Sequence, residues 1–254
     1  MTPASIGIVV FVVAFCGVLL GMRMRAMLPE HCLDKESQDS IKLGTGLIAT
    51  MTALVLGLVT ASTKSSFDDV GSAVTQSASQ LLTLDRSLAR YGRETDGIRH
   101  DLQRLARARV AAVWQQPSQH GSADATSSPT PFQVEQLLEA IRDLTPHNDS
   151  QRALQTRAID QAETLLQSRW VSIISTKSSV PVPFLTVLVL WQIFIFMSFG
   201  LLAPRNWLVV LVLFVCALSV GSAMFLILEM ESPFTGLIRV SAEPLRIAIE
   251  HLNQ

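Results

Sequence analysis

Four long runs without a charged residue limit what this chain can fold into. They cover Pro3–Met22, Leu43–Thr63, Ser178–Pro204 and Asn206–Leu228. A helix rises about 1.5 Å per residue, so about 20 apolar residues span a hydrocarbon core of roughly 30 Å. A helix of a water-soluble protein seldom stays uncharged over this length, because one of its faces meets water. The sequence therefore predicts an all-α integral membrane protein with four transmembrane helices.

The segment between the second and third runs has a helical pattern. Over Phe67–Tyr91 the apolar residues step by three and four positions, and Ser77 fills the one polar slot. Such a seam indicates a helix that packs along one side, so the second membrane helix is expected to continue out of the bilayer as a rod. Gly92 predicts its end, and a further helix is expected over Thr95–Trp114. The seam must be buried within the chain or between chains.

These patterns divide the chain into four parts. Residues 1–64 hold the first two membrane helices and a short charged loop. Residues 65–180 form a helical soluble block, with a flexible Ser- and Pro-rich loop over 115–131. Residues 181–229 form a hairpin of the last two membrane helices. Residues 230–254 form an exit turn and a short amphipathic helix.

Composition and motifs argue against several classes of function. The five histidines are scattered without the spacing of metal ligands, and no nucleophile elbow or P-loop occurs. We therefore expect no catalytic residues, no metal and no cofactor. The formal net charge of −1 indicates no nucleic-acid partner. The dinucleotide-like pattern "GTGLIA" lies inside a membrane run without the α/β surroundings that such a site needs.

The second membrane run carries two sets of small or hydroxyl residues, and they support two interpretations. One set is a stripe at three- and four-residue spacing that would let helices pack closely in lipid, namely Gly46, Thr50, Ala53, Gly57 and Ala61. The other set would line a water-filled pore with its hydroxyl groups, namely Thr45, Thr52, Thr60 and Thr63. In the first run, "GVLLG" over Gly17–Gly21 favours helix packing.

Two further polar features lie in or next to the membrane runs. Gln192 and Ser198 stand within the third run, where a polar side chain makes an inter-helix hydrogen bond or contacts a permeating ion or substrate. Where the fourth run ends, we expect either an exit turn that docks on the soluble helices or a group of acids at a pore mouth or gate. The candidates there are Glu229, Glu231, Pro233, Phe234, Gly236 and Arg239.

The stretch "ILEMESPFTGLIRVSAEPLR" resembles a signature of the bacterial bestrophin-like membrane protein family, a domain of unknown function. The segments "LLTLDRSLARYG", "SRWVSI" and "PVPFLTVLVLWQIFIFMSFGLLAPRN" agree, in order, over nearly the whole chain. Met230, Glu231 and Ser232 depart from the family's usual Leu-Asp-Arg. The family is distantly similar to bestrophins, which are pentameric ion channels. In bestrophins an acidic run that binds calcium follows a Pro-Phe-Gly motif, whereas "LIRVS" follows "SPFTG" here.

The resemblance implies a homo-oligomeric, pentameric ion channel in the bacterial inner membrane, with its pore lined by the second helix. Its partners would be the lipid bilayer, further copies of itself and permeant ions. The alternative is a non-conducting, membrane-anchored helical scaffold or stress-response interaction protein. The two differ in whether a continuous water-lined path follows the second helix.

Four crossings place both termini and the soluble block on one side of the membrane. Five basic residues lie on the other side, in the loop after the first helix and in the hairpin turn, against four near the membrane on the side of the block. This count leans toward an external block, whereas the resemblance implies a cytoplasmic one.

Overall fold

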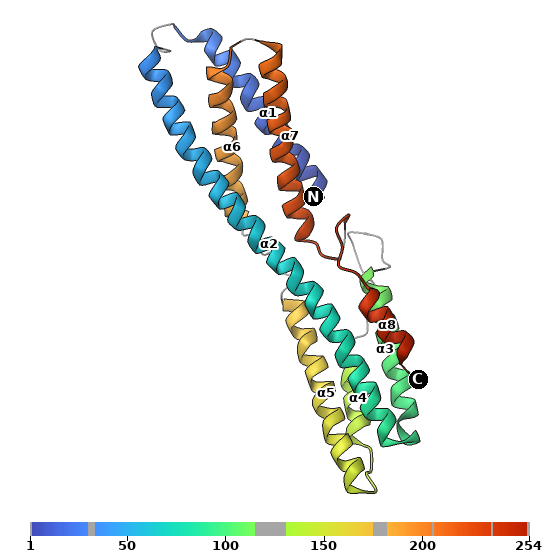
Figure 1. Ribbon diagram of the computed structural model, residues 1–254. Helices are drawn as coiled ribbons and strands as arrows, with labels where there is room; N and C mark the ends of the chain where they lie inside the picture. Colours follow the sequence, from blue (N-terminus) through green and yellow to red (C-terminus); the bar gives the residue numbers. More distant parts are fainter. Residues whose placement is uncertain are drawn as a thin grey trace. The chain divides into compact units, whose positions relative to one another are not determined.

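The computed structural model describes residues 2–29, 34–114, 131–174, 182–204, 206–234 and 236–252, of which 131–134, 167–174 and 182 are described by their backbone alone. In these ranges the regular structure is helical and contains no strand, which confirms the all-α prediction for the described residues (Figure 1). The α-helices are α1 (Pro3–Met27), α2 (Lys35–Tyr91), α3 (Asp96–Trp114), α4 (Pro131–Arg142), α5 (Asp149–Ile174), α6 (Val182–Leu202), α7 (Trp207–Met230) and α8 (Glu243–His251).

The second helix continues far beyond its uncharged run, as predicted. α2 is one helix of 57 residues. It ends at Tyr91, and the next residue, Gly92, has a φ of 140°, in a region that a residue with a side chain rarely adopts. A short 3₁₀ turn over Arg93–Thr95 then leads into α3. The predicted loop at 115–131 falls almost wholly outside the described residues, and α4 begins at Pro131.

The chain separates into two compact units. The first comprises Met1–Ser66 and Ser178–Ser232, and the second comprises Phe67–Lys177 and Pro233–Gln254. Helix α2 contributes residues to both. Among the described residues, four helices are long and apolar enough to cross a membrane, namely α1, α2, α6 and α7.

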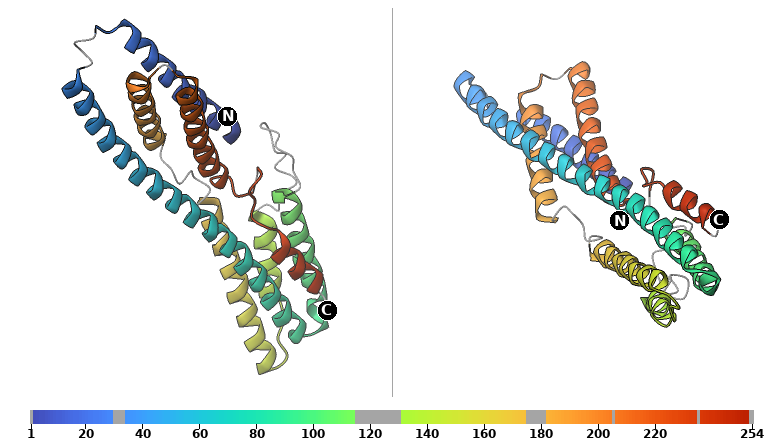
Figure 2. Two further views of the ribbon diagram at one scale, coloured as in Figure 1. Left: turned by 45° about the horizontal axis from the view of Figure 1, so that its top comes forward. Right: turned by 60° about the horizontal axis from the view of Figure 1, so that its bottom comes forward.

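Glycines allow α1 to pack closely against α6 and α7 in the first unit (Figure 2). A Cβ atom added at Gly200 would overlap the carbonyl oxygen of Val18, and one added at Gly21 would overlap that of Met197. Gly17 lies against the α6 backbone in the same way, which confirms that "GVLLG" is a packing motif. Gly7 and Gly221 give α1 and α7 a similar close approach.

An arginine of α1 closes the C-terminal end of α6. The Arg25 guanidinium donates hydrogen bonds to the carbonyl oxygens of Leu202 and Ala203, at 2.8 and 2.6 Å. These carbonyls belong to the last turn of the helix and its end, where no backbone partner is available within the helix. A cation placed there also interacts favourably with the helix dipole.

The seam of α2 is buried inside the second unit. Its side chains join a core cluster with residues of α3, α4, α5 and α8. The central members Leu84 and Leu88 are 0% and 1% exposed. The prediction of a packed seam is therefore confirmed, and the partner that buries it is the chain itself.

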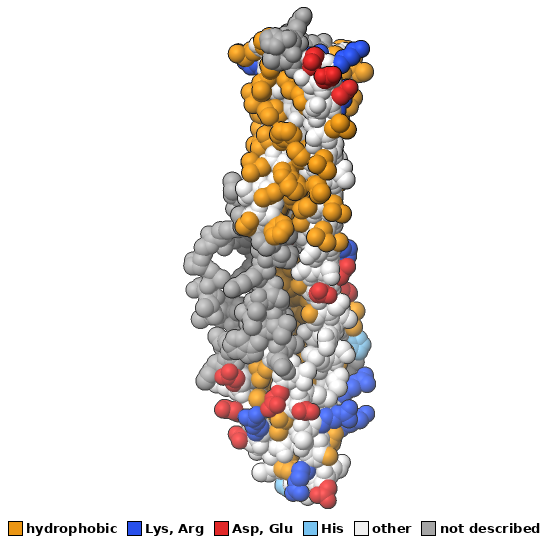
Figure 3. Space-filling view, turned by 90° about the vertical axis from the view of Figure 1, so that its left-hand side faces the viewer, with side chains coloured by type: hydrophobic (Ala, Val, Ile, Leu, Met, Phe, Trp, Pro, Cys, Tyr) orange, Lys and Arg blue, Asp and Glu red, His pale blue; other side chains and the backbone are white. Residues whose placement is uncertain are grey.

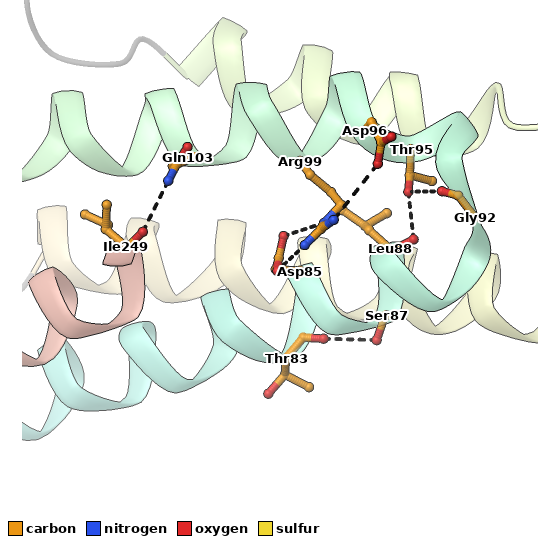
Figure 4. A network of polar contacts seen from close by, with 10 residues as sticks. All are labelled: Thr83, Asp85, Ser87, Leu88, Gly92, Thr95, Asp96, Arg99, Gln103 and Ile249. Carbon is orange, nitrogen blue, oxygen red and sulfur yellow. Dashed lines mark hydrogen bonds and ion pairs between the residues drawn. The ribbon is translucent and has the colours of Figure 1, made fainter. Parts of the chain in front are cut away.

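Polar contacts connect α3 with α2, through Arg99 and Asp85, and with α8, through Gln103 and the Ile249 carbonyl oxygen (Figure 4). Arg99 of α3 donates two hydrogen bonds to the Asp85 carboxylate of α2, from Nε at 2.8 Å and from Nη2 at 2.9 Å. These bonds raise the pKa of Arg99 above its usual value, although burial acts in the opposite direction. The Thr95 hydroxyl donates to the carbonyl oxygens of Leu88 and Gly92, which fixes the turn between α2 and α3.

Candidate functional site

Three of the four threonines predicted to line a pore lie on the inner face of α2. Thr45, Thr52 and Thr63 are only 3%, 3% and 1% exposed. The Thr52 hydroxyl donates to the Ile48 carbonyl oxygen at 2.7 Å, within its own helix. The hydroxyl oxygens of Thr45 and Thr63 have no hydrogen-bond partner among the described residues. Within one chain these three side chains therefore lie against protein, and a role in lining a pore stays a prediction.

The open face of α2 carries the small residues instead. Gly46, Thr50, Ala53, Gly57 and Ala61, which were predicted as a packing stripe, are all exposed, and so is Thr60. A Cβ atom added at Gly46 or Gly57 would meet nothing within 4 Å. The stripe therefore packs against no other part of the described chain. We call these six residues the open stripe.

Large apolar side chains flank the open stripe. They are 63–77% exposed and comprise Leu43, Leu47, Leu54 and Leu58. Figure 3 shows apolar side chains gathered over a long stretch of the first unit, whereas acidic and basic side chains lie at the end of this stretch and over the second unit. An exposed apolar surface of this kind needs lipid or another protein to cover it.

The two polar residues of α6 are buried. Gln192 is 8% exposed and Ser198 is 5% exposed. The Ser198 hydroxyl donates to the Phe194 carbonyl oxygen at 2.9 Å, one turn earlier in the same helix. Both side chains thus lie against protein within one chain, and contact with a permeating ion stays a prediction.

The acids at the end of α7 occupy different surroundings. Glu229 lies in the last turn of the helix and is 3% exposed. Glu231 is half-buried and forms the C-cap of α7. The Ser232 amide donates to the Glu229 carbonyl oxygen at 3.2 Å, which tightens the end of the helix. A gating role for either acid stays a prediction.

The described residues that follow, Pro233, Phe234 and 236–240, form a closed loop within the second unit, and we call them the exit loop. The Val240 amide donates to the Pro233 carbonyl oxygen at 2.8 Å. Gly236 has a φ of 99°, which favours glycine at this turn. Arg239 is exposed.

Trp114, at the end of α3, holds the exit loop in place. Its indole Nε1–H donates to the Val240 carbonyl oxygen at 2.8 Å. Its ring meets that of Phe234 edge to face, with 5.3 Å between the centroids. The exit loop therefore docks on α3 of the second unit, in line with the interpretation of an exit turn, and the alternative role of the acids at a pore mouth stays a prediction. Trp114 was not predicted from the sequence as a docking residue, and the only signal for it is that the indole N–H of a buried tryptophan usually needs a hydrogen-bond partner.

The short helix after the exit loop follows the predicted pattern. The Ser241 hydroxyl accepts a hydrogen bond from the Glu243 amide at 3.1 Å, next to the start of α8. Leu245, Ile249 and Leu252 are buried in the core of the second unit. Among the described residues, no three His, Cys, Asp or Glu side chains are grouped so that they could hold a metal ion.

Comparisons with known proteins agree on one family. The model of the Bestrophin-like domain matches residues 8–245. No curated protein sequence matches the chain. Two crystal structures of a bacterial bestrophin homologue from Klebsiella pneumoniae have a similar fold. One, of a single-substitution variant, has a TM-score of 0.65 at 15% identity, covering 96% of this chain and 99% of that chain. The other has a TM-score of 0.61 at 17% identity, covering 93% and 94%.

Proposed function

This chain belongs to the Bestrophin-like family, and from that premise we propose that several copies of it form a membrane ion channel with α2 along the pore. Bestrophins are ion channels, and the likeness of fold extends over nearly the whole chain. Four helices of suitable length and hydropathy support a membrane location. The pentameric state implied by the resemblance is part of the proposal.

The open stripe of α2 is the observation that carries this proposal. It offers small side chains and two hydroxyl groups on a face that nothing in the described chain covers. Copies arranged around an axis could therefore bring their α2 helices close together and leave a narrow path between them. The run Leu43–Thr63 contains no charge, so this lining would be neutral and would not select ions with a charged ring.

The structure favours a different lining from the four threonines predicted first. Of those four, only Thr60 belongs to the open stripe. We propose Gly46, Thr50, Ala53, Gly57 and Thr60 as the residues nearest the pore axis. Thr45, Thr52 and Thr63 would then position α2 against the rest of its own chain.

The acids at the end of α7 are proposed to act at the mouth of the pore. Glu229→Gln or Glu231→Gln should then alter conductance and leave assembly intact. Unchanged currents in both variants would instead favour a purely structural exit turn.

We place the channel in the bacterial inner membrane, with the second unit and both termini in the cytoplasm. A reporter fused within residues 115–131 would test this orientation. Activity of a reporter that works only outside the cytoplasm would reverse the assignment.

The proposed function is tested by sizing the purified protein in detergent and by measuring ion flux from liposomes. We expect an oligomer and a flux that depends on the protein. An oligomer that conducts no ion under any gradient would favour the non-conducting scaffold, in which the open stripe is only a packing surface. A monomer without flux would contradict the proposed channel.

A further inference from the structure

The exit loop exposes apolar side chains at its tip, outside the membrane-spanning helices. Leu237 is 82% exposed and Ile238 is 36% exposed. Both follow Gly236, whose positive φ turns the chain at this point. The hydrogen bond between Val240 and Pro233 closes the base of the loop, so the two side chains form an apolar projection with a fixed base. We infer that this tip inserts into the lipid headgroup region and anchors the second unit to the membrane surface.

The length of the chain limits how far this tip can lie from the end of α7. Helix α7 ends at Met230, and Leu237 follows only seven residues later. An extended chain spans at most about 3.5 Å per residue, so the tip lies within about 25 Å of the end of α7. This limit holds for any placement of the two units. It requires that α7 spans a membrane, as in the proposed function, but it does not require conduction.

The neighbouring residues match the chemistry of a membrane interface. Arg239 directly follows the apolar pair, is exposed, and can reach lipid phosphate groups. The base of the loop carries the aromatic pair Trp114 and Phe234. Aromatic and basic side chains beside a small apolar surface are typical of segments that lie in the interface and enter it by about 5–10 Å. A bilayer surface therefore fits this loop better than water does.

The test uses a fluorescent label at the tip of the loop. The three native cysteines are replaced by alanine (C16A, C32A, C216A), and Leu237→Cys or Ile238→Cys receives an environment-sensitive dye. The protein is placed in nanodiscs of equal parts phosphatidylcholine and phosphatidylglycerol, with a nitroxide quencher near the headgroup or deep in the acyl chain. His100→Cys is the matched control, because His100 is exposed and lies about 21 Å along α3 from Trp114.

We expect a blue-shifted emission at positions 237 and 238 and a stronger loss of fluorescence with the shallow quencher than with the deep one. The label at position 100 should show neither effect. Water-like emission without quenching at both tip positions would overturn the inference. So would a blue shift that lipid quenchers do not affect, because the tip would then be covered by another copy of the chain. Neither result depends on ion flux, so the inference can fail while the proposed channel stands.

Discussion

Asp85 and Arg99 join α2 to α3 through a largely buried ion pair. The Asp85 side chain is 5% exposed and that of Arg99 is 13% exposed. Asp85→Ala would remove the carboxylate that accepts two hydrogen bonds from the largely buried guanidinium, and would leave Asp96, at 4.0 Å, as its remaining ion-pair partner. Loss of one partner of a buried pair costs about 3–5 kcal/mol. We expect a loss of this size in the free energy of unfolding, measured by denaturant unfolding of the detergent-solubilised protein.

An exposed ion pair on α3 provides the matched control. Asp101 and Arg104 pair at the surface, where their side chains are 55% and 76% exposed. Asp101→Ala should change stability by no more than about 1 kcal/mol, because water screens such a pair. Equal losses in the two variants would show that the Asp85 pair contributes no more than a surface contact.

Tyr91 ends α2 with a buried hydroxyl group. Its side-chain oxygen has no hydrogen-bond partner among the described residues. Burial, and to a lesser degree Glu94, raises the pKa of Tyr91 above its usual value of 10.0. Tyr91→Phe removes this hydroxyl and keeps the ring, so we expect a protein at least as stable as the native one at neutral pH.

The pH dependence of the Tyr91→Phe variant follows from the direction of the pKa shift. Below about pH 10 the tyrosine is neutral in both the folded and the unfolded chain. Above it the unfolded chain releases the proton first, so the native protein loses stability as pH rises. The variant should lose less stability between pH 9 and about 11, measured as the difference in melting temperature. A parallel decline in both proteins would contradict the raised pKa.

At the scale of the helices, the glycines of α1 and α6 differ from those of α2. A Cβ atom at Gly200 would overlap the backbone of α1, whereas one at Gly57 would meet nothing within 4 Å. Gly200→Ala must therefore separate two helices, and we expect a marked loss of folded protein in detergent. Gly57→Ala should leave folding intact and stabilise the helix by up to about 1 kcal/mol. Size-exclusion profiles and thermal melting of the two variants measure this difference.

Wild-type behaviour of Gly200→Ala would contradict the close contact between α1 and α6. A loss of folding in Gly57→Ala would show that another copy of the chain covers the open stripe tightly. The two outcomes are independent, since the two glycines face different neighbours.

The helices themselves were predictable from the sequence, for clear physical reasons. An uncharged run of about 20 residues has few alternatives to a membrane helix. The seam of α2 was predictable because each turn places apolar residues on one side, and Leu84 and Leu88 are indeed fully buried. The close contacts of Gly17 and Gly21 followed from their spacing.

Which face of α2 packs against the rest of the first unit could not be predicted from the sequence in the same way. A threonine hydroxyl in a helix can donate to the carbonyl oxygen four residues earlier, as those of Thr50 and Thr52 both do. The Thr50 side chain is exposed, whereas that of Thr52 is buried. A threonine in a membrane helix therefore does not indicate whether its face meets water, lipid or protein. The docking of the exit loop on Trp114 could not be predicted from the sequence either, because Trp114 and Val240 lie 126 residues apart.

At the scale of the whole molecule, the proposed channel makes a prediction about access from water. Single cysteines are placed in the cysteine-free protein at Ala53 and Gly57 on the open stripe, at Leu54 beside it, and at Thr52 on the inner face. If the open stripe lines the pore, a charged, water-soluble thiol reagent should react at positions 53 and 57 and reduce the current in planar bilayers. It should not react at position 52, which is buried within the chain.

The Leu54→Cys variant distinguishes a water-filled pore from a surface that faces lipid or another copy of the chain. Leu54 is 72% exposed in the single chain, so exposure alone would allow its modification. In the assembled channel we expect lipid or a neighbouring copy to cover it, and a charged reagent then reaches it poorly. Reaction at 53 and 57 but not at 52 and 54 would therefore require a narrow aqueous path along the open stripe. Reaction at position 52 with none at positions 53 and 57 would instead support the inner threonines as the pore-lining residues. It would also mean that α2 rotates about its axis when copies of the chain assemble.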